Sequence, residues 1–152
     1  MQVIVAAIGR DRAGPTRDLF DDYCRRSPWP TRLVEIAPRS SKPIERRLRE
    51  EGERLLQAVP PGAVLVALDE AGRQLDSARL ARRIARWQEQ GRGALAFVIG
   101  GPDGLASSVL DRAEATLAFG RMTWPHRLVR VMLAEQLYRA STILSGHPYH
   151  RA

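Results

Sequence analysis

The sequence predicts a single-domain α/β fold, in which a mostly parallel sheet of five to six strands carries helices on both faces. Short apolar runs of strand length alternate along the chain with longer segments whose apolar residues recur at helical spacing. This βα alternation is typical of a parallel sheet covered by helices. The chain has 152 residues, a length typical of one domain, and contains no repeat, low-complexity segment or linker.

The first half of the chain supplies two strands and two helices. Residues 3–8 form a short apolar strand, which we expect to be buried on both faces. A helix follows over residues 16–26, with a proline in its first turn, and residues 32–36 form the second strand. The polar loop after that strand offers Ser40 or Ser41 as the cap of the next helix. The apolar positions of that helix are Ile44, Leu48, Leu55 and Leu56.

The middle of the chain continues the alternation. Residues 63–68 form a third, continuously apolar strand, and residues 69–72 are its loop. Asp76 or Ser77 caps a third helix. The apolar residues that share its core face are Leu80, Ile84 and Trp87. Its arginines, on other faces, either contact RNA or form a solvated surface: Arg79, Arg82, Arg83 and Arg86.

The last third of the chain holds the most specialised chemistry. Residues 94–99 form a fourth strand, 106–115 a fourth helix, 116–119 a short fifth strand, and 126–144 the final helix. The loops that follow strand ends in a parallel sheet build ligand sites. We therefore expect a site where the third, fourth and fifth strands end.

The charge of the chain favours a polyanionic partner. The net charge is +7 and the isoelectric point is about 10.8, and of 24 basic residues only Lys42 is a lysine. Arginine makes forked contacts to phosphate, so nucleic acid is a natural partner. A GC-rich genome would explain the ratio of arginine to lysine but not the net excess.

Several classes of protein are disfavoured. Cys24 is the only cysteine, so an internal disulfide is impossible, and no signal peptide is visible. No apolar run approaches the roughly 20 residues of a membrane span. We therefore expect a cytoplasmic protein without membrane contact. Three histidines and one distant cysteine give no tetrahedral metal set, so we expect no metal.

The segment IGGPDG, residues 99–104, follows a strand and precedes a helix. Glycines at that position let the backbone approach a ligand closely. The segment is not a GxGxxG fingerprint, and the chain has no P-loop. The alternative interpretation is a tight turn without a ligand.

The final helix has two apolar sides. Its core stripe consists of Val129, Leu133, Leu137, Ala140 and Leu144, whereas Leu128, Met132 and Ile143 lie on a different side. A surface helix needs only one apolar stripe, so the second side favours burial against a further partner such as a second subunit. Glu135 and Arg139 are spaced to pair along the helix, either as an ordinary salt bridge or at the edge of a site.

Three segments carry a family resemblance: GGPDGL at 100–105, LAFGRMTWPHRLVRVMLAEQLYRA at 117–140 and GHPYHR at 146–151. With them the chain resembles the small SPOUT-class methyltransferases that modify N3 of pseudouridine in large-subunit (23S) ribosomal RNA. The similarity runs along the whole chain and includes MQVIVAAIGR, EEGERLL and VALDEAG.

The resemblance implies properties that the residue pattern does not. It implies a trefoil-knotted fold, with the C-terminal segment threaded through an earlier loop, although general connection rules would exclude a knot. It implies a homodimer, S-adenosylmethionine as cofactor, and ribosomal RNA in the assembled ribosome as partner. By this match the cofactor loops lie at Leu68, at Gly100 and Gly101, and over a third loop. That third loop consists of Gly120, Arg121, Met122, Thr123, Trp124 and Pro125.

The candidate catalytic residues are concentrated in the C-terminal tail. Methyl transfer to N3 requires removal of the imide proton and stabilisation of the developing anion. Arg151 is a candidate to hold the anion or a phosphate, His150 to act as base, and Tyr149 to stack on a nucleobase or orient a carbonyl. Second candidates are His126, Glu135 and Arg139.

The alternative for each of these residues is a structural or RNA-positioning role. Residues 147–148 on their own are typical of a chain-terminal turn. A tail so short is normally frayed, and its polar and aromatic composition favours ordering on a partner. Two other functions stay open: a non-catalytic RNA- or ribosome-binding protein with the same fold, and a knotted methyltransferase with another RNA target such as tRNA.

Overall fold

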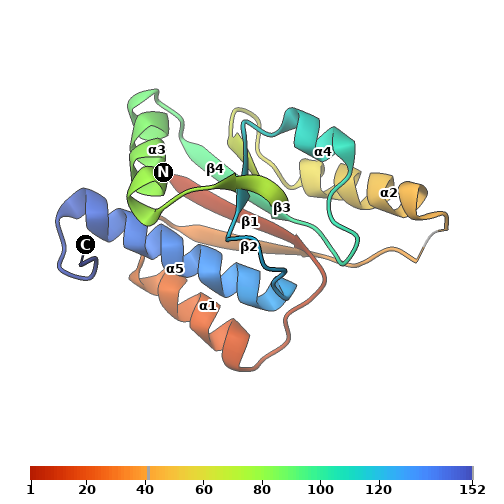
Figure 1. Ribbon diagram of the computed structural model, residues 1–152, viewed down its shortest axis with the longest axis horizontal. Coiled ribbons are helices and arrows are strands. Elements are labelled where there is room, and N and C mark those ends of the chain that lie inside the picture. Colours follow the sequence, from red (N-terminus) through yellow and green to blue (C-terminus); the bar gives the residue numbers. More distant parts are fainter. Residues whose placement is uncertain (41, 152) are drawn as a thin grey trace.

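The computed structural model describes residues 1–40 and 42–151 and contains a five-stranded sheet with the order β2-β1-β4-β3-β5 (Figure 1). Every neighbouring pair of strands is parallel. At the centre of the sheet, Val5 pairs with Leu33 on one side and with Phe97 on the other. The strands are β1 (Gln2–Ile8), β2 (Thr31–Ile36), β3 (Val64–Gln74), β4 (Ala94–Ile99) and β5 (Ala115–Ala118). The predicted α/β class and parallel sheet are confirmed.

Five helices cover the two faces of this sheet, and α1 and α5 lie opposite α2 and α4 (Figure 1). They are α1 (Pro15–Arg26), α2 (Ile44–Gln57), α3 (Ser77–Glu89), α4 (Ser107–Arg112) and α5 (His126–Ser145). One core cluster joins α1, α3 and α5 to the sheet, and a second joins α2 and α4 to the opposite face. In β1, Val3, Val5 and Ala7 belong to the first cluster and Ala6 and Ile8 to the second, and residues 3–8 are all buried, as predicted.

The third strand is longer than predicted. We expected residues 69–72 to be a loop, but β3 continues to Gln74 across an irregularity between Leu68 and Arg73. The Asp69 carboxylate accepts a hydrogen bond from the Ala71 backbone, so the turn-like sequence forms a bulge inside the strand. After the bulge, Arg73 pairs with the same residue of β5, Leu117, that Leu68 pairs with before it.

Two boundaries in the loops also differ. The N-cap of α2 is Pro43 and makes no side-chain cap, so Ser40 is not the cap, and Ser41 lies outside the described residues. The N-cap of α3 is Asp76, which accepts a hydrogen bond from the Arg79 backbone, as predicted. The end of α4 was predicted too late, because the Glu114 backbone already donates to Leu65 on β3 and the chain has returned to the sheet.

The apolar sides of α5 are distributed differently from the prediction. Leu133, Leu137 and Ala140 are buried as expected, but Leu144 is 42% exposed at the end of the helix. Ile143, assigned to the other side, packs against the core. The reason is that α5 lies between α1 and α3 and contacts both, so its buried surface is wider than one stripe. Within the described part of the chain, no helix combines the length and apolar character needed to cross a membrane.

Candidate functional site

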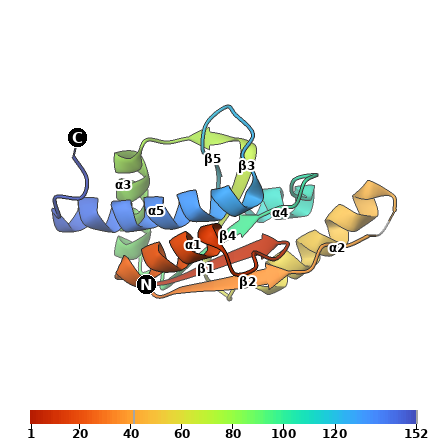
Figure 2. The ribbon, with the colours of Figure 1, turned by 90° about the horizontal axis from the view of Figure 1, so that it is seen from below.

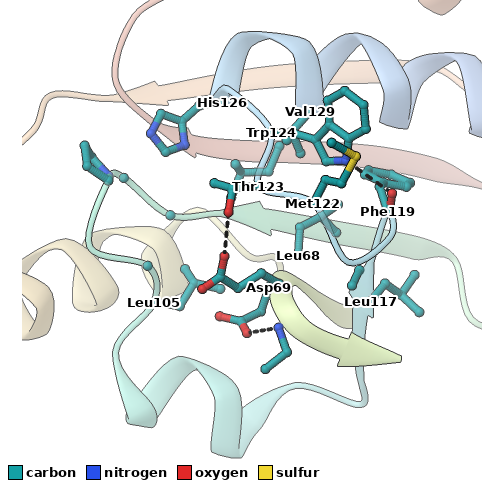
Figure 3. A pocket seen from close by; sticks show the side chains of 18 of the residues that line it. Leu68, Asp69, Leu105, Leu117, Phe119, Met122, Thr123, Trp124, His126 and Val129 are labelled. Carbon is teal, nitrogen blue, oxygen red and sulfur yellow. Dashed lines mark hydrogen bonds between the residues drawn. The ribbon is translucent and has the colours of Figure 1, made fainter. Parts of the chain in front are cut away.

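A cleft of about 400 Å³ opens at the bulge in β3 and at the ends of β4 and β5 (Figure 3). Its walls come from four segments of the chain. They are residues 68–71 at the β3 bulge, 99–105 after β4, 117–120 and 122–124 after β5, and 126 and 129 of α5. The cleft lies at the carboxyl ends of parallel strands, where α/β sheets bind ligands. The volume is in the range of small-molecule sites, about 300–1,000 Å³.

The glycine-rich loop after β4 has a shape that requires glycine. The Gly104 backbone donates to the Gly101 carbonyl at 3.0 Å, and Gly104 has a φ of +81°. A Cβ on Gly100 would overlap the Gly104 carbonyl group. The loop therefore brings its own backbone to the cleft in place of side chains. The loop forms a tight turn, and this turn lines the cleft.

The loop after β5 folds back toward β3. The Thr123 hydroxyl donates to the Glu70 carboxylate at 3.3 Å, and the Trp124 indole N–H donates to the Phe119 carbonyl at 3.3 Å (Figure 3). These contacts hold the third predicted loop over the cleft. Met122, in the same loop, is 72% exposed.

The structure places most of the predicted cofactor residues at this cleft. Those that line it are Leu68, Gly100, Gly101, Gly120, Met122, Thr123 and Trp124. Arg121 and Pro125 belong to the same loop but do not line the cleft. Of the predicted catalytic residues, His126 lines it.

The site residues predicted from the sequence did not include three carboxylates that line the cleft: Asp69, Glu70 and Asp103. The signal for them was available, because each lies in a loop or bulge that directly follows a strand end. The predicted site residues also did not include Phe119 and Val129, which add apolar wall. The cleft thus combines apolar surface, backbone groups and negative charge.

A buried arginine fixes α5 beside this cleft. The Arg130 side chain is 2% exposed and donates to the Glu35 carboxylate at 2.8 Å and to the Ile8 and Gly9 carbonyls at 3.1 and 2.8 Å. It therefore ties α5 to the ends of β1 and β2. His126 lies one helical turn before it, and burial, followed by the charge of Arg130, lowers the pKa of His126 below its usual 6.5. The imidazole is consequently neutral at pH 7 and available as a proton acceptor.

The C-terminal tail packs against the other end of α5. The Tyr149 ring lies 4.7 Å from the Tyr138 ring, and its hydroxyl donates to the Glu135 carboxylate at 3.1 Å. Glu135 also accepts a hydrogen bond from Arg139 at 2.9 Å, so the predicted pair forms. The Arg26 guanidinium lies 4.4 Å from the centre of the Tyr138 ring. The expectation of a frayed tail is therefore wrong as far as Tyr149.

Tyr149 is a hydrogen-bond donor at neutral pH. Burial raises its pKa to about 12, with further contributions from Tyr23 and Glu135. The residues after it differ in exposure: His150 is half-buried and Arg151 is exposed. The Tyr149 backbone donates to His147 at 3.1 Å, which is the turn predicted for residues 147–148.

The six predicted catalytic residues fall into two separate groups. His126 lies at the cleft at the start of α5, whereas Glu135 and Arg139, in the middle and second half of the helix, lie with the tail and do not line the cleft. The 20 residues of α5 make it about 30 Å long. The C-terminal end of the chain and the loop between β5 and α5, which lines the cleft, lie at opposite ends of this helix (Figure 2).

Two other candidates for chemistry have no role at the cleft. Burial raises the pKa of Cys24 to about 11, so its thiol stays protonated and is a poor nucleophile. Among residues 1–40 and 42–151, no three His, Cys, Asp or Glu side chains are grouped to hold a metal ion.

Comparison with known proteins identifies a family model and relatives that match this chain. A family model described as "Predicted SPOUT methyltransferase" matches residues 1–150. The chain belongs to the SPOUT methyltransferase family. A relative from Rhodospirillum centenum, named ribosomal RNA large subunit methyltransferase H, is 57% identical over all of both chains. A protein of the same name from Paramagnetospirillum magneticum is 48% identical over 99% of both chains.

A solved structure supports the SPOUT fold of the chain. A probable methylase family protein from Haemophilus influenzae Rd KW20 matches with a TM-score of 0.62 and 12% identity, over 99% of this chain and 70% of the other. The family resemblance stated from the sequence is confirmed by the family model and the relatives, and this solved structure shows the shared fold. A SPOUT knot is expected to thread the C-terminal segment through an earlier loop. The loop between β5 and α5, where that segment begins, lies beside the β3 extension (Figure 2).

Proposed function

We propose that the protein transfers a methyl group from S-adenosylmethionine to N3 of a pseudouridine in 23S ribosomal RNA, acting on the assembled ribosome in the cytoplasm. One observation carries the proposal: relatives named ribosomal RNA large subunit methyltransferase H match this chain from end to end at 46–57% identity. The net charge of +7 supports an RNA substrate.

The cleft has the chemistry that S-adenosylmethionine requires. This donor is a cation that carries an adenine, a ribose and an amino-acid group. Leu68, Leu117 and Phe119 offer apolar surface to an adenine. The carboxylates of Asp69 and Glu70 suit hydroxyl groups and positive charge. When bound, the donor supplies a methyl group on a sulfonium, a leaving group that needs no metal.

The protein has to position the acceptor nucleotide and remove the proton from its N3 atom. Neutral His126 lies at the cleft and is a candidate to take the N3 proton. The tail offers a cation, Arg151, that would stabilise the N3 anion, together with the second base candidate, His150. Tyr149 holds these two residues by its contacts with Tyr138 and Glu135.

The positions of tail and cleft favour a site shared between two subunits. The docked Tyr149 contacts Glu135 and Tyr138, which follow His126 on α5 by 9 and 12 residues, or about 14 and 18 Å along the helix axis, and the described residues of the tail do not line the cleft of their own chain. In a homodimer with antiparallel α5 helices, the tail of one subunit would lie at the cleft of the other. Large apolar side chains are exposed on α1 and α5 and are available for such an interface: Leu19, Leu128 and Leu144.

Titration calorimetry with S-adenosylmethionine tests the proposed function against a non-catalytic role. We expect one donor to bind per chain, and we expect the heat to disappear when a bulky side chain fills the cleft, as in Gly101→Trp. Gly101 is buried, and the nearest atom to a Cβ there is the Ile8 side chain at 3.3 Å. A folded wild-type protein that takes up no donor would instead support a ribosome-binding protein without catalysis.

A further inference from the structure

We propose that a basic prong at the start of α2 binds the phosphates of ribosomal RNA next to the target nucleotide. The basic prong consists of the side chains Arg39, Lys42, Arg46 and Arg49. This inference rests on the proposed function, which makes ribosomal RNA the substrate, and it assigns a contact surface on this chain to that substrate.

The basic prong extends away from the body of the domain. The start of α2 lies beyond the end of the sheet, on the side of the domain opposite the C-terminus (Figures 1 and 2). All four side chains belong to exposed residues. A surface that protrudes in this way can contact a large, curved polyanion without movement of the core.

Positive charge is concentrated there. Residues 37–49 contain five basic side chains and one acidic one, Glu45. Within residues 1–40 and 42–151, neither Arg39 nor Lys42 forms an ion pair. Arg46 contacts Glu50 at 3.0 Å but keeps 61% of its side chain exposed. Arginine and lysine in such a cluster neutralise phosphates and release counterions.

The base of the basic prong is joined to the cleft. Arg47, on the inner side of α2, forms an ion pair with Asp103 of the glycine-rich loop. Glu51 is 5% exposed and accepts a hydrogen bond from the Arg39 backbone at 2.9 Å. The other oxygen of Glu51 would lie 3.9 Å from a Cβ on Gly101. An RNA with one nucleotide in the cleft would therefore carry its neighbouring phosphates toward the basic prong.

The arginines of α3 serve as the matched control. Arg79, Arg82 and Arg86 are also exposed, on a helix that does not line the cleft. Arg79 already contacts Asp76 at 3.4 Å. Replacing three arginines there changes the net charge by the same amount as replacing three basic-prong residues, from +7 to 7 − 3 = +4.

The test compares the variant Arg39→Gln/Lys42→Gln/Arg46→Gln with the variant Arg79→Gln/Arg82→Gln/Arg86→Gln. Ribosome binding is measured by cosedimentation over a series of salt concentrations, without the methyl donor. We expect the basic-prong variant to bind ribosomes at least about tenfold more weakly than the wild type. The plot of log affinity against log salt concentration should also be less steep, by about 2 in the size of its negative slope. Melting temperature and donor affinity should stay at the wild-type values.

The control variant should bind ribosomes within about twofold of the wild type. The proposal is overturned if the basic-prong variant binds like the wild type, or if the control variant loses as much affinity. Ribosomes are also methylated in a parallel assay. Absence of methylation by the wild type would count against the proposed function. The comparison of ribosome binding between the two variants tests the basic prong independently of methylation.

Discussion

Gly100 is the residue on which the shape of the glycine-rich loop depends most directly. A Cβ there meets the backbone of Gly104, which cannot move without opening the turn. We predict that Gly100→Ala lowers donor affinity by at least about tenfold, about 1.4 kcal/mol, because the loop has to change shape. Calorimetric titration gives the dissociation constant.

The control for this variant is Gly93→Ala. A Cβ on Gly93 would meet nothing within 4 Å, and its backbone is not in the left-handed region. The control should bind the donor like the wild type. Equal donor affinity in Gly100→Ala and wild type would contradict the role given to this loop.

His126 should make the folded protein sensitive to mild acid. Its pKa is lowered in the folded state, so at pH values just below 6.5 the unfolded chain binds more protons than the folded one. The free energy of unfolding attributable to His126 therefore falls as the pH drops through that window and is unaffected above it. We predict that His126→Gln flattens the decline between pH 7.5 and pH 5, as measured by urea unfolding. An unchanged slope would show that His126 titrates normally.

Arg130 joins α5 to the ends of the first two strands through one ion pair and two hydrogen bonds to carbonyls. Removing the charge of Arg130 takes this cation from Glu35, which keeps the hydrogen bond from the Asp11 backbone, and removes a donor from two backbone carbonyls. We predict that Arg130→Met lowers the free energy of unfolding by about 3 kcal/mol, the cost typical of breaking a buried ion pair from one side. Denaturant unfolding followed by circular dichroism measures this loss.

A neighbouring arginine on the same helix provides the comparison. Arg127 contacts Asp11 at 3.5 Å, but its side chain is 60% exposed. Asp11 is buried but keeps the hydrogen bond from the Thr16 hydroxyl, and the Arg127 guanidinium is largely in solvent, so Arg127→Met should cost about 1 kcal/mol or less. A similar loss of stability in both variants would mean that the burial of Arg130 is not what matters.

The periodicity of apolar residues was sufficient to predict most helices and strands, but not to predict how far β3 extends. The buried strand β1 and the helix stripe with Leu80 and Ile84 follow directly from local pattern. The extension of β3 does not, because its second half is held by pairing with Leu117, more than forty residues later. Likewise Arg130 reads as a surface arginine until Glu35, 95 residues away, is placed beside it.

The candidate site was predictable where chemistry and sequence position coincide. Glycines after strand ends indicated the cleft without any knowledge of the ligand. The docking of Tyr149 was not predictable from pattern, because it depends on Tyr138 and Arg26 from two different helices. The polar and aromatic composition of the tail indicated that it orders on a partner, and the resemblance to a family made it a candidate for catalysis.

Because the described residues of the docked tail do not line the cleft of their own chain, we predict that each active site of a dimer uses the cleft of one subunit and the tail of the other. A variant lacking residues 149–152 should fold and bind the donor but fail to methylate RNA, and Gly101→Trp should fail because it cannot bind the donor. Unfolded and refolded together, the two variants should regain about one quarter of wild-type activity, because half of the random dimers carry one intact site.

This mixing experiment has a clear negative outcome. If each chain uses its own tail, then neither variant can complement the other, and the mixture stays inactive. Size-exclusion chromatography with light scattering on the same mixture confirms that dimers have re-formed. Full activity of the truncated variant alone would remove the tail from catalysis altogether.

Methyl transfer to the ribosome is the central claim, and mass spectrometry tests it most directly. Ribosomes that lack the modification are incubated with the protein and isotope-labelled S-adenosylmethionine, and the ribosomal RNA is digested and sequenced by fragment mass. We predict one labelled methyl group on N3 of a pseudouridine in 23S ribosomal RNA. Label on another atom or another RNA, or no label despite donor binding, would contradict the proposed function.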